Sequence, residues 1–277
     1  MSVNLVLRNL TVQNNTSTGS ILSLEKFWTT KIHDSVFENN YNEENGGALE
    51  LLGMITSTTA YDVSVLEIGG KFLCRNNTSK GLGGCLFMSN IQLNFLQDNV
   101  NIEMSKNNAT RGGAIYWEQM YPKVDSISSL SRNVLMNFTS NVATYSGGAL
   151  YLDGVNFYGF LSNLVMDGNQ AYYGGAFTID NSFITMIGIF TNNFASYGAV
   201  FCINRTSDAS SLTIGGNVRG NYAKYSGSFG HLVVFNSSYL ILDSVYVGTD
   251  INFSSNDLTP IDQLFMDPLE LLQAPQV

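Results

Sequence analysis

The feature that most constrains this chain is a degenerate repeat, whose clearest copy spans residues 138–152 and reads FTSNVATYSGGALYL. Each copy has an apolar residue, an asparagine three positions later, a short bridge, a Gly-Gly-Ala element and then alternating apolar residues. Successive repeat asparagines are 24 to 36 residues apart. This spacing is typical of stacked units that can bury their apolar faces only against neighbouring units.

The repeats align along almost the whole chain. The repeat asparagines are aligned as Asn15, Asn40, Asn76, Asn107, Asn141, Asn169, Asn193, Asn221 and Asn256. The small residues that end the Gly-Gly-Ala element are aligned as Ser20, Ala48, Cys85, Ala114, Ala149, Ala176, Ala199 and Ser228. After this element the apolar residues alternate at period two, as expected for half-buried strands.

These features predict an all-β fold, a right-handed parallel β-helix (solenoid) of about eight to nine coils with loop insertions. The longer spacings place insertions near residues 53–60, 118–132 and 204–211. A β-propeller is the main rival, but its blades need about 40 residues and four strands. We assign residues 1–256 to the β-helix repeat domain. Residues 257–277 are assigned to a C-terminal capping or docking tail, because 260–272 are acidic and amphipathic.

Glycines and asparagines are expected at the corners of each coil. Glycine adopts positive φ and allows close backbone approach, which suits the paired glycines Gly147, Gly148, Gly174 and Gly175. The asparagine amides can bond to backbone groups and to the asparagine of the next coil in a ladder, or they can be free turn residues. The asparagines assigned to these corners are Asn40, Asn107, Asn141, Asn169, Asn193 and Asn221.

The composition favours an uncharged polar surface. Charged residues make up 13% of the chain, against about 25% in typical globular domains. The net charge is −9 and no basic run is present, which argues against nucleic-acid binding. No segment predicts a membrane span, and the first residues do not resemble a signal peptide.

Acceptor sites for N-glycans are abundant, at roughly twice the number that composition alone explains. This excess favours a secreted eukaryotic protein with covalent N-glycans. The candidate sites are Asn9, Asn14, Asn15, Asn76, Asn77, Asn108, Asn137, Asn204, Asn236 and Asn252.

The three cysteines, Cys74, Cys85 and Cys202, do not predict a disulfide framework. Cys74 follows Leu73, the residue aligned at the apolar position, and is expected to point outward, whereas Cys85 and Cys202 are expected to point inward. Cys85 and Cys202 lie four coils apart, roughly 19 Å at ~4.8 Å per stacked strand, which is too far to bridge. We expect buried free thiols that act as small hydrophobic groups, and no metal site or other cofactor.

One candidate binding site is a column of tyrosines. Tyr145, Tyr173, Tyr197 and Tyr225 each follow their repeat asparagine by four residues, on four successive coils. Stacked tyrosines can form a platform for sugar rings or for a partner surface. The alternative is an aromatic ladder that only covers a corner.

A weaker candidate is a column of carboxylates. Glu118, Asp153 and Asp180 occupy one repeat position on three successive coils. Such a column could hold Ca²⁺ or pair an acid with a base. The alternative is that these are ordinary turn residues at strand ends, since Asp153 precedes a glycine and Asp180 an asparagine.

The repeat resembles the Phe-x-x-Asn and Gly-Gly-Ala-Ile/Leu/Val repeat of the chlamydial polymorphic outer-membrane proteins, and similar repeats occur in large surface proteins of protists. Residues 37–40 with 46–49, 138–141 with 147–150, and 190–193 with 198–200 carry the resemblance, which covers residues 12–256. It implies a β-helical passenger or ectodomain used in adhesion or surface architecture. The excess of glycosylation sites suits a eukaryotic relative, from a protist, better than a bacterial one.

Two classes of function are therefore predicted. The first is an extracellular structural or adhesive glycoprotein scaffold at the cell surface, as part of a larger surface protein or of an end-to-end filament. Its partners would be itself or neighbouring β-helix domains, and host or matrix glycans. The alternative is a carbohydrate-active β-helix enzyme, a polysaccharide lyase or hydrolase, which needs acidic clusters on adjacent coils. We expect no enzyme activity, because no stronger catalytic cluster accompanies the carboxylate column.

Overall fold

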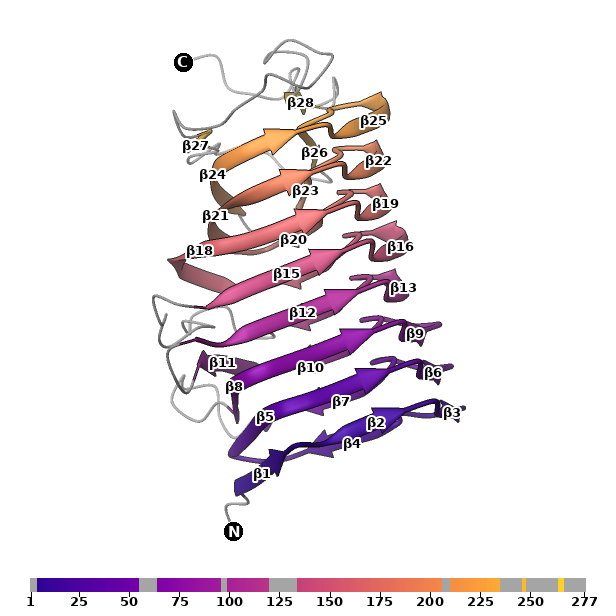
Figure 1. Ribbon diagram of the computed structural model, residues 1–277. Helices are drawn as coiled ribbons and strands as arrows, with labels where there is room; N and C mark the ends of the chain where they lie inside the picture. The colour runs from indigo at the N-terminus through magenta and orange to yellow at the C-terminus, as the bar shows by residue number, and fades with distance from the viewer. Residues whose placement is uncertain are drawn as a thin grey trace.

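The computed structural model describes residues 4–54, 64–95, 99–119, 134–205, 210–234, 246–247 and 264–266. Within these residues every element is a β-strand, and the strands stack coil upon coil into a column (Figure 1). All strand pairs are parallel, in three sheets of 11, 9 and 8 strands. The predicted parallel β-helix is therefore confirmed.

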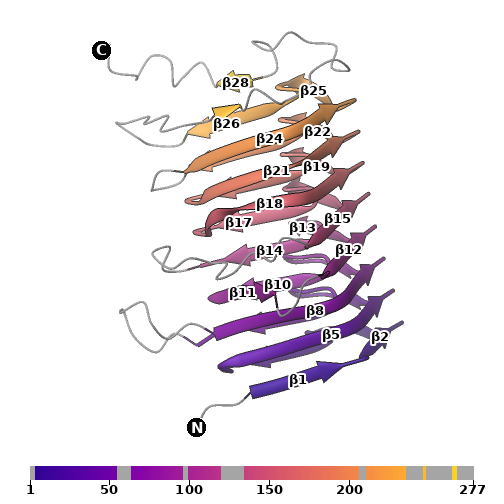
Figure 2. The same cartoon turned by 60° about the vertical axis from the view of Figure 1, so that its left-hand side comes forward.

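Each coil contributes in turn to sheets that we call A, B and C. Sheet A consists of β1 (Asn4–Arg8), β5 (Thr29–Glu38), β8 (Ser64–Arg75), β12 (Asn101–Ser105), β15 (Leu135–Thr139), β18 (Asn156–Asp167), β21 (Phe183–Thr191), β24 (Ser211–Arg219) and β27 (Tyr246–Val247), with β2 (Thr11–Gln13) beside β5 and β11 (Ile91–Phe95) beside β8. Figure 2 brings the long strands of this sheet forward.

Sheets B and C complete each coil. Sheet B consists of β3 (Thr16–Ser17), β6 (Tyr41–Asn42), β9 (Thr78–Ser79), β13 (Asn108–Arg111), β16 (Val142–Ser146), β19 (Gln170–Tyr173), β22 (Phe194–Tyr197) and β25 (Tyr222–Ser226). Sheet C consists of β4 (Leu22–Glu25), β7 (Leu49–Leu52), β10 (Leu86–Ser89), β14 (Ile115–Glu118), β17 (Leu150–Asp153), β20 (Phe177–Asp180), β23 (Phe201–Arg205), β26 (Gly230–Val234) and β28 (Leu264–Met266).

The interior is a continuous apolar column, because the inward residues of successive coils stack in register. In β15, Met136 and Phe138 are buried while Leu135 is 41% exposed. The largest fully buried side chains are mostly phenylalanines, and rings from different sheets approach each other, as Phe177 does to Phe190 at 6.1 Å between centroids. This burial is the main stabilising term of the fold.

A ladder of asparagine side chains runs between sheets A and B. Asn141 shows the pattern: its Oδ1 accepts from the backbone N and from Nδ2 of Asn107, both at 3.0 Å. Its Nδ2 donates to Asn169 Oδ1 at 3.0 Å and to the Met104 carbonyl at 2.9 Å. All four hydrogen-bonding positions of this buried amide are thus used, which satisfies a polar group inside the protein.

The ladder corrects one position of the sequence alignment. Its rungs are Asn15, Asn40, Asn77, Asn107, Asn141, Asn169, Asn193 and Asn221. Asn77, not Asn76, is the rung in the third coil. Asn76 is the exposed residue before it, with φ 53°, a conformation that Asn39 and Asn192 share at the same place in their coils. Asn256 lies outside the described residues.

That shift of one residue reverses the prediction for Cys74. Cys74, not Leu73, pairs with Phe37 in register and points inward, where it is fully buried. It forms a disulfide with Cys85, at a Cα–Cα distance of 6.2 Å. The prediction of free thiols is therefore wrong for these two residues, because a slip of one position in a strand moves every side chain to the other face.

The Gly-Gly corner between sheets B and C has two separate requirements for glycine. Gly147 has φ 67°, and a Cβ there would lie 2.2 Å from the Leu150 carbonyl oxygen. A Cβ on Gly148 would lie 1.9 Å from the Gly175 carbonyl oxygen in the next coil. The first glycine thus makes the turn, and the second lets two coils stack at this corner.

The alignment of this corner also needs correction in three coils. Phe201 pairs with Phe177, and Gly230 pairs with Phe201. The buried position of Ala176 is therefore occupied by Val200 and Phe229 in the next two coils, and not by Ala199 and Ser228. In the first coil Leu22 pairs with Leu49, so this position belongs to Ile21 and not to Ser20. Cys202, a buried cysteine outside the disulfide, consequently lies on the outer side of sheet C and not in the core.

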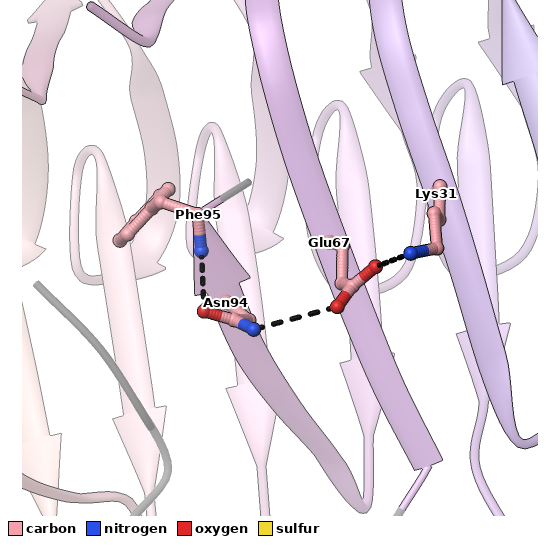
Figure 3. Close-up of polar contacts among 4 residues, drawn as sticks. All are labelled: Lys31, Glu67, Asn94 and Phe95. Atoms are coloured by element: carbon pink, nitrogen blue, oxygen red, sulfur yellow. Dashed lines mark hydrogen bonds and ion pairs between the residues drawn. The ribbon is translucent and has the colours of Figure 1, made fainter. Parts of the chain in front are cut away.

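A polar cluster links three neighbouring strands of sheet A (Figure 3). Lys31 Nζ lies 2.6 Å from Glu67 Oε2, and Asn94 Nδ2 donates to Glu67 Oε1 at 3.4 Å. Asn94 Oδ1 also accepts from the backbone N of Phe95 at 2.8 Å. The cluster holds β11 against β8 and β5, and we assign it this structural role.

The predicted domain boundary at residue 256 stays a prediction. Within the predicted tail, residues 264–266 form β28, which pairs with β26 at the end of sheet C. The rest of 257–277 lies outside the described residues, as do most of the three predicted insertions. In the part of the chain that is described, no helix is long and apolar enough to cross a membrane.

Candidate functional site

The predicted tyrosine column lies on the outer side of sheet B, on β16, β19, β22 and β25. The ring of Tyr173 is 5.7 Å from that of Tyr145 and 5.4 Å from that of Tyr197, and Tyr197 is 5.4 Å from Tyr225. The four rings therefore form a continuous row along the axis of the β-helix. The pairing register of the strands shifts at two places along this row. Ser146 pairs with Tyr173 in place of Tyr145, and Ser226 pairs with Tyr197 in place of Tyr225.

Two further tyrosines, missed in the sequence, lie on the same outer side of sheet B. Tyr172 lies 4.7 Å from Tyr173 and 5.7 Å from Tyr197, and Tyr222 stacks on Phe194 at 5.6 Å. They occupy other repeat positions, so a search along one column does not find them. The sequence feature that could have revealed Tyr172 is its position directly before Tyr173. We call the six residues Tyr145, Tyr172, Tyr173, Tyr197, Tyr222 and Tyr225 the tyrosine face.

The tyrosine face has an exposed and a structural part. Tyr145, Tyr172, Tyr222 and Tyr225 are 46%, 41%, 55% and 58% exposed. Tyr173 and Tyr197 are half-buried, and their rings lie 5.9 and 5.0 Å from that of the buried His231.

His231 is in register with Cys202 on sheet C, so the two inner tyrosines cover the outer side of this sheet. The binding platform predicted from the sequence stays a prediction. The inner tyrosines cover the corner, and the outer four are free to contact another molecule.

A second aromatic group lies on the outer side of sheet C. Phe87, Tyr116 and Tyr151 stack in register at 5.6 and 5.0 Å, and all three are buried. The Arg111 guanidinium covers them from sheet B, 5.4 Å from the Tyr151 ring and 5.1 Å from the Tyr145 ring. Burial raises the pKa of Tyr116 and of Tyr151 far above the usual value of a tyrosine. This group is a small second core that supports the tyrosine face.

The carboxylate column is also present on sheet C. Glu118 pairs with Asp153, and Asp153 with Asp180, on three neighbouring strands. Asp180 is 4% exposed, and its Oδ2 accepts hydrogen bonds from the Tyr151 hydroxyl and from Asn204 Nδ2, each at 3.2 Å. Asp180 is thus held in the second core. Among the described residues, no group of three or more His, Cys, Asp or Glu side chains could hold a metal ion.

The other two carboxylates are partly buried. Burial raises the pKa of Glu118. A hydrogen bond from Ser89 lowers this pKa, and the negative charge of Asp153 raises it. Burial likewise raises the pKa of Asp153, although Asn181 and the charge of Arg111 act in the opposite direction. Both groups therefore bind a proton more tightly in the folded protein than in the unfolded chain.

Replacing both carboxylates, as Glu118→Gln with Asp153→Asn, should change how stability depends on pH. A carboxyl with a raised folded-state pKa favours folding at low pH, and this contribution is lost as pH rises through the folded pKa. The wild type should therefore lose stability relative to the double variant between about pH 4 and about pH 7. Thermal melts across this range should show the variant higher by a few degrees at neutral pH. The exposed Glu44→Gln is the control, and parallel melting curves for all three proteins would contradict the prediction.

The structure separates the candidate glycosylation sites by exposure. Asn9, Asn14, Asn15, Asn76 and Asn108 are exposed. Asn77 is fully buried with its amide in the ladder, Asn137 is half-buried in β15, and Asn204 donates to Asp180. Asn236 and Asn252 lie outside the described residues. In the folded protein the first group can carry a glycan, and Asn77 has no room for one.

Together these observations define a class: a parallel β-helix repeat protein with an exposed aromatic face. Residues 136–153 match the family model described as the Chlamydia polymorphic membrane protein repeat. This segment runs from the second residue of β15 through β16 to the end of β17, about one coil, and includes Asn141 and Gly147-Gly148. The searches of curated proteins and of solved structures returned no significant match. The match supports a relation to the polymorphic membrane proteins and indicates, coarsely, a surface-associated repeat protein.

Proposed function

We propose that this chain is an extracellular adhesive scaffold whose tyrosine face binds glycans on another surface or in a matrix. The observation that supports it most is the exposure of Tyr145, Tyr172, Tyr222 and Tyr225, which lie on β16, β19 and β25 along one face of the β-helix. Contiguous exposed aromatic side chains mark interaction sites more often than chance placement on a surface.

Carbohydrate suits this face for two physical reasons. The apolar C–H side of a sugar ring packs on an aromatic ring, and the tyrosine hydroxyl remains available for hydrogen bonds to sugar hydroxyls. Successive coils are ~4.8 Å apart, which is comparable with the length of one sugar residue in an extended chain. A regular row of tyrosines can therefore follow a linear oligosaccharide residue by residue.

The proposal includes N-glycosylation of the scaffold and its assembly with other β-helix domains. The exposed acceptor sites Asn14 and Asn76 lie at the corner between sheets A and B, where an attached glycan would point into solvent. A parallel β-helix also presents strand edges that can pair with a further coil. Such a scaffold suits end-to-end contact with itself or with neighbouring β-helix domains. The eukaryotic, protist origin rests on the glycosylation sites alone and belongs to this proposal.

Removing the exposed tyrosines should abolish glycan binding without unfolding the protein. In the quadruple variant Y145S/Y172S/Y222S/Y225S we expect at least a tenfold loss of affinity, because each ring contributes about 1 kcal/mol. Purified protein would be applied to a glycan array that holds neutral and acidic oligosaccharides. Circular dichroism should show an unchanged β-sheet spectrum, since Tyr173 and Tyr197 are retained and still cover the second core.

The matched control removes exposed apolar area from another face. Ile187 and Ile189 of β21 are 36% and 42% exposed on sheet A, and I187S/I189S should bind as the wild type does. If no glycan binds to the wild type, or if the quadruple variant binds equally well, the proposed function is wrong.

The alternative of a carbohydrate-active enzyme stays a prediction. Its catalytic candidates are Glu118 and Asp153, since Asp180 is engaged in hydrogen bonds in the second core. Release of reducing ends from any oligosaccharide that the array identifies, lost in the double variant of Glu118 and Asp153, would favour the enzyme.

A further inference from the structure

The charges on the tyrosine face differ from those of the whole protein. The chain has a net charge of −9. However, the five strands β13, β16, β19, β22 and β25 contain no Asp or Glu, and their only charged residues are Arg111 and Lys224. The strands of this face therefore carry positive charge on an acidic molecule, although the charge of Arg111 also acts on the neighbouring Asp153 of sheet C.

Lys224 is exposed beside the tyrosines. Its Nζ lies 4.9 Å from the centre of the Tyr225 ring. A hydrogen bond with Tyr225 raises the pKa of Lys224, and the other groups that raise it are Tyr222 and Tyr172. No carboxylate is among these groups, and the ion pairs found in the described part of the chain do not include Lys224. Its charge is therefore available to a ligand.

The repeat itself supplies a comparison for Lys224. Lys80 follows Asn77 by three residues, as Lys224 follows Asn221, so both occupy the same repeat position on the outer side of sheet B. Lys80 lies 5.9 Å from the Tyr41 ring centre but pairs with Glu43 Oε1 at 2.7 Å. In the coil before Lys224 the residue equivalent to Glu43 is Ser196. Among the residues that the structure describes, the lysine at this repeat position is paired with a carboxylate in the N-terminal coils and with none in the tyrosine face.

Arg111 marks the other end of the row, against Tyr145. Four strand steps separate β13 from β25 along sheet B, or roughly 19 Å at ~4.8 Å per step. A chain of several sugar residues spans this distance and would meet a cation near each end. Among the described residues, neither cation forms an ion pair with a carboxylate.

We infer that the ligand of the tyrosine face is an acidic glycan, an oligosaccharide that carries carboxylate or sulfate groups. The sugar rings pack on the tyrosines, and the anionic groups are paired by Lys224 and Arg111. This inference rests on the proposed function and adds the charge of the ligand to it. It also explains why the acidic surface of the rest of the chain does not prevent binding at this face.

The test compares an acidic oligosaccharide with its own neutral form and with a sulfated oligosaccharide. Titration calorimetry would use a hyaluronan oligosaccharide, its carboxyl-reduced form, and a heparin oligosaccharide of similar length. We expect at least one acidic oligosaccharide to bind tenfold tighter than the reduced form, and its affinity to fall as salt rises, because salt screens exposed charges. Binding of hyaluronan or of heparin alone would assign the anion as carboxylate or as sulfate.

Lys224→Gln should weaken acidic binding about threefold to tenfold. It should leave binding of the reduced form unchanged, and Lys80→Gln, at the same repeat position, should bind like the wild type. Equal affinity for acidic and reduced forms, or equal effects of the two lysine variants, would overturn the inference. The glycan array and the quadruple tyrosine variant test the proposed function separately. If only neutral glycans bind and their binding still requires the tyrosines, the proposed function is supported and the inference of an acidic ligand is wrong.

Discussion

Asn141→Ala should destabilise the protein by about 3–5 kcal/mol, which is among the largest effects expected for a single substitution here. The change removes one hydrogen bond from each of four partners: the backbone N and Nδ2 of Asn107, the Met104 carbonyl and Asn169 Oδ1. All lie in the interior, where an unpaired polar group costs far more than it does at the surface. Urea unfolding followed by tryptophan fluorescence would measure the loss, since Trp117 is buried in the adjacent coil.

The first rung provides the control for this prediction. Asn15 is exposed, and its amide donates to Asn40 Oδ1 at 2.9 Å at the edge of the ladder. Asn15→Ala should cost less than about 1 kcal/mol, because water can replace what is lost. Equal losses at Asn15 and Asn141 would show that the ladder does not depend on burial, contrary to this prediction.

Removing the disulfide should lower the free energy of unfolding by roughly 3 kcal/mol, the loop-closure value for a loop of this length. Several other coils have a Phe and an Ala at the positions of Cys74 and Cys85, for example Phe138 and Ala149. C74A/C85A loses both the cross-link and the volume of the two sulfur atoms. C74F/C85A introduces the Phe and Ala pair of the preceding coil, Phe37 and Ala48, and should recover part of the loss, because it refills the interior.

Reduction of the wild type provides an independent measurement. Reductant should lower its unfolding midpoint towards that of C74A/C85A and leave the two double variants unchanged. Cys202→Ala is the control, because this buried thiol takes no part in the cross-link. A midpoint that does not respond to reductant, or three alkylated thiols in the unfolded protein without reductant, would contradict the assignment.

The fold could be predicted because most coils keep the same corner residues. An asparagine three residues after an apolar residue and a pair of glycines identify each coil even where the strands between them vary. The register failed where neighbouring residues are chemically alike. In a sequence alignment, Asn76 and Asn77 fit the corner position equally well. Leu73 and Cys74 likewise fit the apolar position equally well. Only the hydrogen bonds between coils distinguish them, and the error in the cysteines followed from that slip.

The candidate site was predicted only in part, for a related reason. The column of Tyr145, Tyr173, Tyr197 and Tyr225 is visible at one repeat position, but the full face combines three positions that meet only when the coils are stacked. Tyr172 and Tyr222 belong to the other two. The burial of Tyr116 and Tyr151 on the outer side of sheet C could not be foreseen either, since it depends on Arg111 reaching across from sheet B.

The asparagine ladder also gives the β-helix a direction. Every side-chain carbonyl in it points toward the N-terminal coil and every side-chain amino group toward the C-terminal coil, from Asn15 to Asn221. The amide dipoles therefore add along the axis, much as peptide dipoles add along an α-helix. If two β-helices met through their N-terminal ends, the side-chain carbonyls of the two ladders would face each other. If the C-terminal end of one met the N-terminal end of the other, amino groups would face carbonyls and the hydrogen bonds of the ladder could continue. Any assembly through these ends would therefore be polar and open, and its length would have to be limited by something other than symmetry.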